Sequence, residues 1–342
     1  MAEVITVGLD LAKNVFQAHG ADASGRAVLR KKLRRDQVLA FFAQLPACVV
    51  AMEACGGAHF WGRELARLGH EVRLIPPAYV RPFVKRQKSD MADAEAICEA
   101  AQRPTMRFVA VRSEEVQGAA MVFRVRELLI RQRTQAINAL RGHLTEFGLV
   151  VPQGAANAAR LIALVEDPDS GLPAEGRAAL KVLVGALIHL EAEVGRLDGE
   201  VARRAKENEV ARRLMTVPGI GPLIATALAV LASPPETFRC ARDFAAWLGL
   251  TPRQHSTGGK QRLGATTKMG ERSLRRLLIL GANSVIIKRH VHAAARPGTW
   301  LAGLIARKPP LLVRVALASK MARIVWALMA RGGVYQAPAT AA

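Results

Sequence analysis

The chain has 342 residues, 51% of them hydrophobic and 5% aromatic, with 49 Lys and Arg against 28 Asp and Glu. This composition describes ordinary globular material, long enough for two domains with sizeable cores. The charge is uneven: residues 1–150 have 22 basic and 15 acidic side chains, 151–250 have 11 and 12, and 251–342 have 16 and 1. We expect the last segment to contact a polyanion, with nucleic acid as the first interpretation and an anionic membrane as the alternative.

A membrane-spanning segment is not expected. The one long uncharged stretch, residues 216–235, is broken by prolines and glycines, so its apolar helix is too short to cross a bilayer. No basic-then-apolar signal precedes Val4, and the cysteines lack the close paired spacing of a zinc site or a disulfide framework. These observations favour a cytoplasmic, reducing location. The four cysteines are Cys48, Cys55, Cys98 and Cys240.

The first 75 residues alternate β-branched runs with helical patterns. The expected order is β-β-β-α-β-α-β, which is that of a ribonuclease-H-like or RuvC-like fold, in which the first and fourth strands lie side by side. Asp10 ends the first strand and Glu53 follows the fourth, so the two carboxylates should face each other. The expected strands are residues 4–10, 15–19, 27–33, 48–52 and 71–75, and the helices are 36–45 and 56–69.

A second pair of acids follows this region. Asp90 and Asp93 stand three apart in a strong helix-forming segment, which places both on one helical face. Each acid alone has an ordinary explanation: a helix N-terminus for this pair, a strand-end turn for Asp10 and a helix cap for Glu53. Together, in this order, the four predict a metal site. Two Mg²⁺ ions held there could stabilise the attacking and leaving oxygens of an in-line phosphoryl displacement.

Four cations precede the acidic pair. Beside a metal centre they could hold a phosphate backbone, although a solvated helix face explains any single one of them equally well. The four are Arg81, Lys85, Arg86 and Lys88.

Two long helices are expected in the middle of the chain. Residues 113–147 contain no proline and several arginines, which predicts a long basic helix. A second helix has an apolar seam with alternating steps of three and four, typical of a coiled coil that pairs either two subunits or this helix with the 113–147 helix. We expect self-association, with an intramolecular hairpin as the alternative. The seam consists of Leu180, Leu183, Leu187, Leu190, Val194, Leu197 and Val201.

The segment 217–228 resembles the hairpin of a helix-hairpin-helix motif. Gly219 and Gly221 permit a tight turn whose backbone N–H groups could bind a phosphate without recognising sequence. A purely structural connector between helices is the alternative.

A Gly-rich loop with two hydroxyl residues follows, inside a dense basic field. Ser256 and Thr257 could merely hydrogen-bond phosphates from a flexible DNA-contacting loop, or one of them could attack phosphorus and hold the strand covalently, with nearby cations stabilising the charge. Spacing alone does not choose between these. The cations expected to contact nucleic acid are Arg253, Lys260, Arg262, Lys268, Arg272, Arg275 and Arg276.

Five motifs, spread over nearly the whole chain, closely resemble the transposases of the insertion-sequence one-ten family. They are Gly8-Leu-Asp-Leu-Ala-Lys13, Met52-Glu-Ala-Cys-Gly56, Lys88-Ser-Asp-Met-Ala-Asp-Ala-Glu95, Val217-Pro-Gly-Ile-Gly221 and Gly249-Leu-Thr-Pro-Arg-Gln-His-Ser-Thr-Gly-Gly-Lys260. The resemblance implies a RuvC-like domain with an Asp-Glu-Asp-Asp set, a coiled-coil connection and a C-terminal domain with a serine. It also implies recombination of donor and target DNA directed by a bridge RNA.

Carried over onto this sequence, the acidic set falls on Asp10, Glu53, Asp90 and Asp93. Alignment on Gly258 places Thr257 at the nucleophile position and Ser256 one residue before it; we favour Ser256, because a primary hydroxyl is the less hindered nucleophile. The resemblance also implies that this loop meets the acidic set of another subunit in a dimer or tetramer. Strand exchange through a phosphoserine intermediate conserves bond energy and needs no nucleotide cofactor.

The expected division of the chain is a RuvC-like domain over residues 1–110, long helices over 111–208, a mainly α C-terminal domain over 209–335 and a flexible tail over 336–342. Two other functions remain open. One is a RuvC-type structure-specific endonuclease that uses the same metals with water as the nucleophile. The other is a non-catalytic nucleic-acid-binding scaffold, which has no use for four clustered acids.

Overall fold

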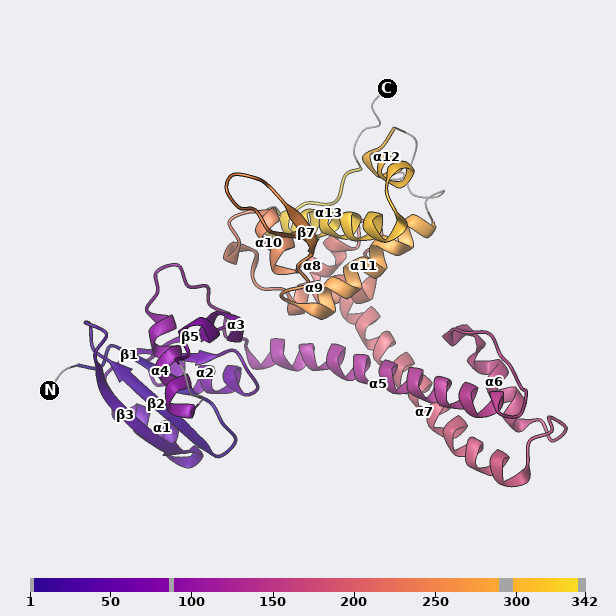
Figure 1. Ribbon diagram of the computed structural model, residues 1–342, viewed down its shortest axis with the longest axis horizontal. Helices are drawn as coiled ribbons and strands as arrows, with labels where there is room; N and C mark the ends of the chain where they lie inside the picture. The colour runs from indigo at the N-terminus through magenta and orange to yellow at the C-terminus, as the bar shows by residue number, and fades with distance from the viewer. Residues whose placement is uncertain (1–2, 86–88, 289–297, 338–342) are drawn as a thin grey trace. The chain divides into compact units, whose positions relative to one another are not determined.

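The computed structural model describes residues 3–85, 89–288 and 298–337. Contacts within the chain group these residues into two compact units, Met1–Gln117 and Gly118–Ala342 (Figure 1). The finer division into three domains and a tail stays a prediction.

The first unit is built on a five-stranded mixed sheet with the order β3-β2-β1-β4-β5 (Figure 1). Its first three strands form an antiparallel meander, whereas β4 runs parallel to both β1 and β5. The expected element order and the predicted pairing of the first and fourth strands are therefore confirmed. The strands are β1 (Thr6–Asp10), β2 (Val15–Ala21), β3 (Ala27–Arg34), β4 (Val49–Glu53) and β5 (Glu71–Ile75).

The two faces of this sheet pack against different helices, because successive side chains on a strand point to opposite faces. Val7, Leu9 and Val50 belong to the core formed with α1 (Val38–Ala43) and α2 (Ala58–Arg67). Ala51, on the opposite face of β4, packs against α4. Short turns of helix complete the unit: η1 (Arg35–Gln37), α3 (Pro77–Val80) and η2 (Arg81–Phe83).

Helix α4 (Asp90–Ala101) lies unusually close to strand β1. A Cβ atom added to Gly8 would overlap the carbonyl oxygen of Ala94 and the backbone nitrogen of Cys98, so only glycine permits this approach. The Cys98 thiol donates a hydrogen bond of 3.5 Å to the carbonyl of Thr6, two residues before Gly8 on the same face. This packing fixes the position of the helix's first turn.

The two long helices expected from the sequence are α5 (Glu114–Thr145), which belongs to the second unit from Gly118 onward, and α7 (Ala174–Glu207), which lies wholly in that unit. The end of α5 and the first half of α7 share one apolar cluster with α6 (Ala158–Glu166), which follows the short turn η3 (Ala155–Asn157). The members of this cluster include Ile137, Leu140, Leu144, Leu161, Val165, Leu180, Val184 and Leu187.

Most of the predicted α7 seam is thus buried within a single chain. Leu180, Leu187, Val194, Leu197 and Val201 are all less than 9% exposed without any second copy. The contacts around Leu180 and Leu187 fit the intramolecular alternative, and an ion pair between Arg126 of α5 and Asp198 of α7, at 2.5 Å, lies farther along the same helices. Coiled-coil pairing and self-association stay predictions, and the buried seam gives self-association no direct support.

The rest of the second unit is a helical assembly around one large apolar core. Two short strands, β6 (Pro252–Gln254) and β7 (Leu263–Thr266), form a separate antiparallel hairpin. Within the described residues no helix is long and apolar enough to cross a membrane. The helices are α8 (Glu209–Leu214), α9 (Pro222–Leu231), η4 (Pro235–Thr237), α10 (Ala241–Trp247), α11 (Arg272–Ile287), α12 (Trp300–Arg307) and α13 (Pro310–Arg331).

Candidate active site

Three of the four predicted acids converge in the first unit. One carboxylate oxygen from each of Asp10, Asp90 and Asp93 lies within 4.8 Å of the other two. Asp10 ends β1 on the face that α4 covers, two residues after Gly8. The two other acids stand in the first turn of α4, which Ser89 caps by accepting a hydrogen bond of 3.2 Å from the Ala92 N–H. Strand end and helix start are thus brought together by backbone packing.

Glu53 ends β4 beside this cluster. Strand β1 pairs in parallel with β4, with Gly8 opposite Ala51, so the same register continued by two residues sets Asp10 opposite Glu53. Glu53 shares the α4 face of the sheet with Ala51, and its charge raises the pKa of Asp10. It nevertheless falls outside the group of three closest acids.

Without a bound cation, the negative charges of the clustered carboxylates repel one another. Burial and, to a lesser degree, the charges of Asp93, Asp90 and Glu53 together raise the pKa of Asp10 from 3.8 to about 6. Hard divalent cations bind carboxylate oxygens at about 2.0–2.6 Å, so oxygens that share one ion lie up to about 4–5 Å apart. The donor type and the spacing therefore fit a divalent cation.

The four cations predicted beside the acids have different surroundings. Arg81 is exposed in η2. Lys85 is also exposed, but its ammonium donates a hydrogen bond of 2.5 Å to the Glu95 carboxylate, which raises the pKa of Lys85. Arg86 and Lys88 lie outside the described residues. Binding of a phosphate backbone by this group stays a prediction.

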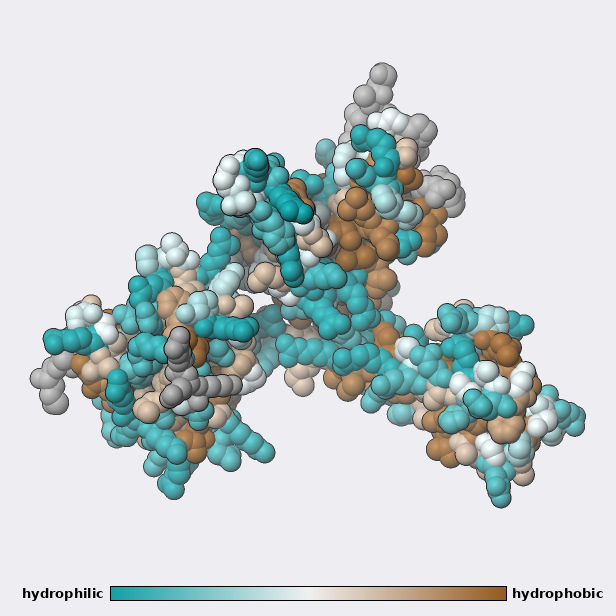
Figure 2. All heavy atoms as spheres, viewed as in Figure 1, coloured by the Kyte–Doolittle hydropathy of each residue, from teal (hydrophilic) through white to brown (hydrophobic). Residues whose placement is uncertain are grey.

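The predicted Gly-rich loop is an ordered hairpin. Beyond β6 and β7 the pairing continues, because the His255 N–H donates to the Arg262 carbonyl at 2.8 Å. Thr257 and Lys260 then exchange backbone hydrogen bonds of 3.3 and 3.0 Å around Gly258 and Gly259, both of which have positive φ. A two-residue turn of this kind requires such φ values, which explains the glycine pair. Residues 252–263 are all exposed, and Figure 2 shows this region as mostly hydrophilic surface.

Ser256 and Thr257 differ in their hydrogen bonds. The Ser256 hydroxyl oxygen accepts a bond of 3.3 Å from the backbone N–H of Arg262, across the hairpin. An N–H donated to a hydroxyl oxygen stabilises negative charge there and leaves the O–H free to donate. Thr257 takes part in the turn through its backbone. The hairpin therefore offers a physical reason to prefer Ser256 as a nucleophile.

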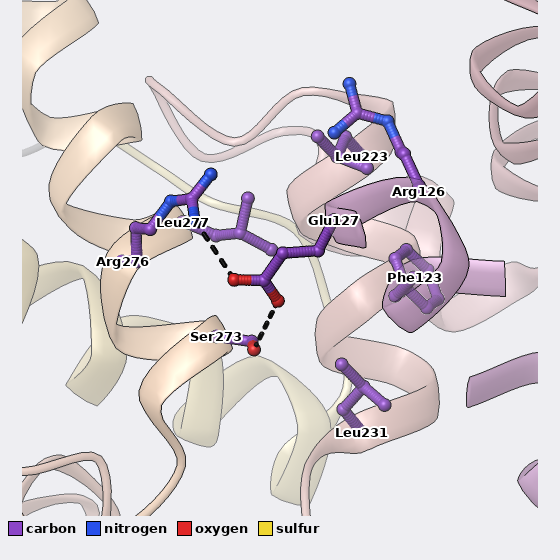
Figure 3. A pocket seen from close by; sticks show the side chains of 8 residues that line it. All are labelled: Phe123, Arg126, Glu127, Leu223, Leu231, Ser273, Arg276 and Leu277. Atoms are coloured by element: carbon purple, nitrogen blue, oxygen red, sulfur yellow. Dashed lines mark hydrogen bonds and ion pairs between the residues drawn. The ribbon is translucent and has the colours of Figure 1, made fainter. Parts of the chain in front are cut away.

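Most of the predicted nucleic-acid-binding cations of the C-terminal segment are exposed on or beside the hairpin: Arg253, Lys260, Arg262, Lys268 and Arg272. Two others are engaged within the unit. Arg276 donates to the Glu127 carboxylate of α5 at 3.0 Å, while Glu127 also accepts from the Ser273 hydroxyl at 3.1 Å (Figure 3). Arg275 donates to two backbone carbonyls. An internal structural role for Arg275 and Arg276 was not foreseen from the sequence.

The space beside Glu127 is lined by four apolar and four polar or charged side chains and measures only about 40 Å³ (Figure 3). It has room for a few water molecules at most, not for a nucleotide. Its residues therefore serve the packing of α5, α9 and α11.

The two predicted phosphate-binding glycines join α8 to α9. Gly219 has a φ of 84° and packs directly against Gly281 of α11, where a Cβ atom on either residue would collide with the other's carbonyl oxygen. This close approach explains Gly219 without a phosphate. Gly221 precedes the first turn of α9, is exposed and has open space around it. A helix-hairpin-helix function stays a prediction for this segment.

Sequence reasoning assigned no role to Gly8, although it lies in a motif that carried the resemblance. Its position two residues before Asp10, on the same face of the strand, is the signal that could have identified it. No local pattern distinguishes Arg275 from the exposed arginines on either side, because its partners are carbonyls more than five residues away in the chain.

The comparisons with known proteins agree with this geometry. A family model of DEDD transposases of the IS110 type, described as Transposase, matches residues 7–148, and one described as Transposase IS116/IS110/IS902 family matches residues 211–296. The matched segments contain the acidic cluster and the hairpin. Fold, cluster and matches together define a DNA-processing enzyme, a transposase with an α/β domain of the ribonuclease-H type.

Curated relatives match almost end to end. A protein named probable family 20 transposase, from Pseudomonas aeruginosa, is 49% identical over 332 residues, which cover 96% of this chain and 98% of the relative. The transposase for insertion sequence element IS1328, from Yersinia enterocolitica, is 41% identical over 98% of this chain and 99% of its own length. The transposase for IS1111A, from Coxiella burnetii, is 38% identical over 98% and 92%. The chain belongs to the IS110 family of insertion-sequence transposases.

Proposed function

We propose that this transposase cuts and rejoins DNA strands with a divalent metal held by its acidic cluster and with the Ser256 hydroxyl as the nucleophile. The observation that carries the proposal is the convergence of Asp10, Asp90 and Asp93 at the edge of the sheet. Three carboxylates placed this close together repel one another, and a divalent cation bound between them would offset that repulsion.

Asp10, Asp90 and Asp93 would hold the metal, most simply Mg²⁺, and Glu53 would complete the set from the neighbouring strand end. Two ions are expected, as in other enzymes that perform in-line phosphoryl displacement. When bound, the metal polarises the scissile phosphate and neutralises charge on its oxygens. The chain's own contribution is to keep the acid oxygens in place through the β1–α4 packing.

The Ser256 oxygen would attack phosphorus, so that an Oγ–P bond forms while the bond from phosphorus to one sugar oxygen breaks. The serine proton is released to water, and the departing sugar oxygen takes a proton from water. Attack by the sugar hydroxyl of a second strand then reverses these events and regenerates the serine. The Arg262 N–H supports the attacking oxygen, and the exposed Arg253, Lys260 and Arg262 side chains supply positive charge for the phosphate.

The nucleic-acid partners follow from charge and from the resemblance. Residues 251–342 contain 16 basic and 1 acidic side chain, which favours sequence-independent contact with phosphates. We propose that donor and target DNA bind here and beside the cations that precede Asp90, that a bridge RNA directs the choice of sites, and that a homo-oligomer, a dimer or tetramer, joins an acidic cluster to a hairpin from another copy. Sequencing the RNA that copurifies with the chain tests the RNA-guided part.

A covalent adduct distinguishes this mechanism from a nuclease that uses water. With labelled DNA carrying the element's end, the wild-type chain should yield a denaturation-resistant protein–DNA adduct in Mg²⁺. Ser256→Ala should remove the adduct, and Thr257→Ala should retain it. If Thr257→Ala alone removes the adduct, the nucleophile is Thr257.

The control is Ser24→Ala, which removes an exposed turn serine of the first unit and should leave the adduct unchanged. Undiminished strand cleavage by the Ser256→Ala, Thr257→Ala double variant, without any adduct in the wild type, would contradict the serine mechanism. That result would instead support the RuvC-type endonuclease.

A further inference from the structure

The hairpin that carries Ser256 begins and ends at backbone segments in very close contact. Gly249 precedes it with a φ of 68°, and Gly270 follows it with a φ of 75°. A Cβ atom on Gly249 would overlap the Met269 carbonyl oxygen, and one on Gly270 would overlap the Trp247 carbonyl oxygen. The two stems of the hairpin therefore meet backbone to backbone, which only glycine permits at these positions.

Arg275 bridges these two stems. A single nitrogen of its guanidinium, Nη1, donates to the Leu248 carbonyl at 3.0 Å and to the Met269 carbonyl at 2.8 Å. Leu248 lies before the hairpin and Met269 after it, so both N–H groups of this nitrogen are used to join the stems. Burial, and to a lesser degree the charge of Arg272, lowers the pKa of Arg275, which agrees with a guanidinium turned into the protein.

Three further hydrogen bonds join the stems at the hairpin base. Backbone N–H groups of Thr267 and Lys268 donate to the carbonyls of Thr251 and Gly249, at 2.9 and 3.3 Å, and the Arg253 guanidinium donates a longer bond of 3.4 Å to the Thr267 carbonyl. Residues 252–263, farther out, are exposed. Leu250 anchors the first stem in the apolar core, but the residues beyond it bury little apolar surface. The charged hydrogen bonds from Arg275 therefore contribute much of what fixes the direction of the hairpin.

The helix that carries Arg275 is itself anchored. Glu271 caps α11 by accepting from the Ser273 N–H at 3.1 Å, and Glu127 of α5 holds the Ser273 hydroxyl and Arg276 in the same turn (Figure 3). Hydrogen bonds thus connect Glu127 to the first turn of α11, and Arg275 of that helix to the hairpin stems.

We propose that Arg275 is a positioning residue that clasps the two stems of the hairpin and so fixes where the Ser256 hydroxyl is presented, rather than a residue that contacts nucleic acid. The inference rests on the proposed function for its catalytic consequence. The clasp itself is a statement about the protein alone and is measured separately.

The charge-conserving variant Arg275→Lys separates the two roles. A phosphate contact depends mainly on positive charge, which lysine keeps. The lysine ammonium is compact, strongly hydrated and shorter in reach than the guanidinium, so it should not bond both carbonyls as Arg275 does. The clasp therefore predicts that Arg275→Lys and Arg275→Met behave alike. A phosphate contact predicts that Arg275→Lys resembles the wild type.

Hydrogen exchange followed by mass spectrometry tests the clasp without DNA. In both variants, exchange in peptides spanning residues 249–270 should become about tenfold faster or more, as expected from the loss of hydrogen bonds to a charged group. Peptides from α9 and α13 should keep wild-type protection. Unchanged exchange in the hairpin, or equal loss across α9 and α13, would overturn a local clasp.

Adduct formation tests the catalytic consequence. Both variants should form the Ser256 adduct about 10- to 100-fold more slowly at saturating DNA, because small misplacement of a reacting group is costly, while DNA affinity stays within about twofold of wild type. The matched control is Arg242→Lys, at an exposed arginine of the neighbouring helix α10, which should change neither quantity. Weakened DNA binding with an unaltered adduct rate at saturation would overturn the proposal. If Ser256→Ala still forms the adduct, the proposed function fails, and the exchange result still decides the clasp.

Discussion

The acidic cluster and the serine hairpin carry the two halves of the proposed chemistry on very different supports. Asp10, Asp90 and Asp93 stand on a buried strand end and on a helix that Gly8 draws against the sheet. Ser256 stands on an exposed hairpin held by backbone hydrogen bonds and by Arg275. Carboxylates that repel one another stay close only if a rigid core holds them, whereas a hydroxyl that must approach a DNA strand can be carried by a hairpin with few stabilising bonds at its base. Substitutions in the two regions should therefore fail differently.

The largest effect is expected at the cluster. Asp93→Asn keeps the shape of the side chain but removes one negative ligand, so strand cleavage should fall by about 10³-fold while DNA binding and folding are kept. Gel assays of cleavage and of binding measure the two quantities on the same protein. Asp36→Asn is the control, because Asp36 is an exposed acid that forms an ion pair with the exposed Arg34. Full cleavage activity in Asp93→Asn would contradict a role for Asp93 as a metal ligand, and absence of cleavage in the wild type as well as the variant would favour the non-catalytic scaffold.

Gly8→Ala tests whether the scaffold behind the acids is as rigid as the packing indicates. The added methyl group would collide with backbone atoms of α4, which cannot move aside like a flexible side chain. We expect a loss of about 2–3 kcal/mol in the free energy of unfolding by urea, together with weaker cleavage. Gly56→Ala, where the new methyl group meets open space, should change stability by less than about 0.5 kcal/mol. Equal stability of the two variants would mean that α4 is not held in place by this contact.

Glu127→Ala extends the comparison to the support of the hairpin. It removes the acceptor of the Ser273 and Arg276 bonds, and both partners are partly exposed, so we expect only about 1–2 kcal/mol of lost stability. The rate of adduct formation should fall, while the identity of the cleavage products should be the same as with the wild type. A loss of stability as large as that of Gly8→Ala would contradict the proposed difference between the packing behind the acidic cluster and the contacts behind the hairpin.

Asp10→Asn should have the smallest effect on stability, and it should stabilise the protein rather than destabilise it. Because the folded protein raises the pKa of Asp10 from 3.8 to about 6, the folded state loses stability as pH rises through this range. Without divalent ions, the variant should be more stable than wild type by roughly 1 kcal/mol at pH 7 to 8, after allowance for solvent screening. The advantage should shrink as the pH falls through 6 and vanish near 4. Thermal melts at several pH values measure it; an advantage independent of pH would contradict the repulsion.

The convergence of Asp10, Asp90 and Asp93 could be predicted from the sequence because a few local patterns determine it. Strand order places Asp10 beside Glu53, and a three-residue spacing places Asp90 and Asp93 on one face of a helix. The distance from that helix to the sheet could not be predicted, because it depends on the contact of Gly8 with Ala94 and Cys98.

The hairpin was harder to predict for physical reasons. Its residues are polar and glycine-rich, so no apolar alternation indicates strands, and the pairing of His255 with Arg262 depends on a turn at Gly258 and Gly259. Likewise, the seam of α7 predicted a helix with an apolar stripe but not the partner that covers it. Leu187 is buried against α5 and α6 of the same chain, a choice that depends on chain connections rather than on the heptad pattern.

Binding of Mn²⁺, followed by its electron paramagnetic resonance signal, tests most directly whether Asp10, Asp90 and Asp93 share a cation. The wild-type chain and the Asp36→Asn control should bind Mn²⁺ with the same affinity, and Mg²⁺ should compete. Asp10→Asn, Asp90→Asn and Asp93→Asn should each weaken this binding by about tenfold or more. Equal Mn²⁺ affinity in all five proteins would contradict a metal centre at the edge of this sheet.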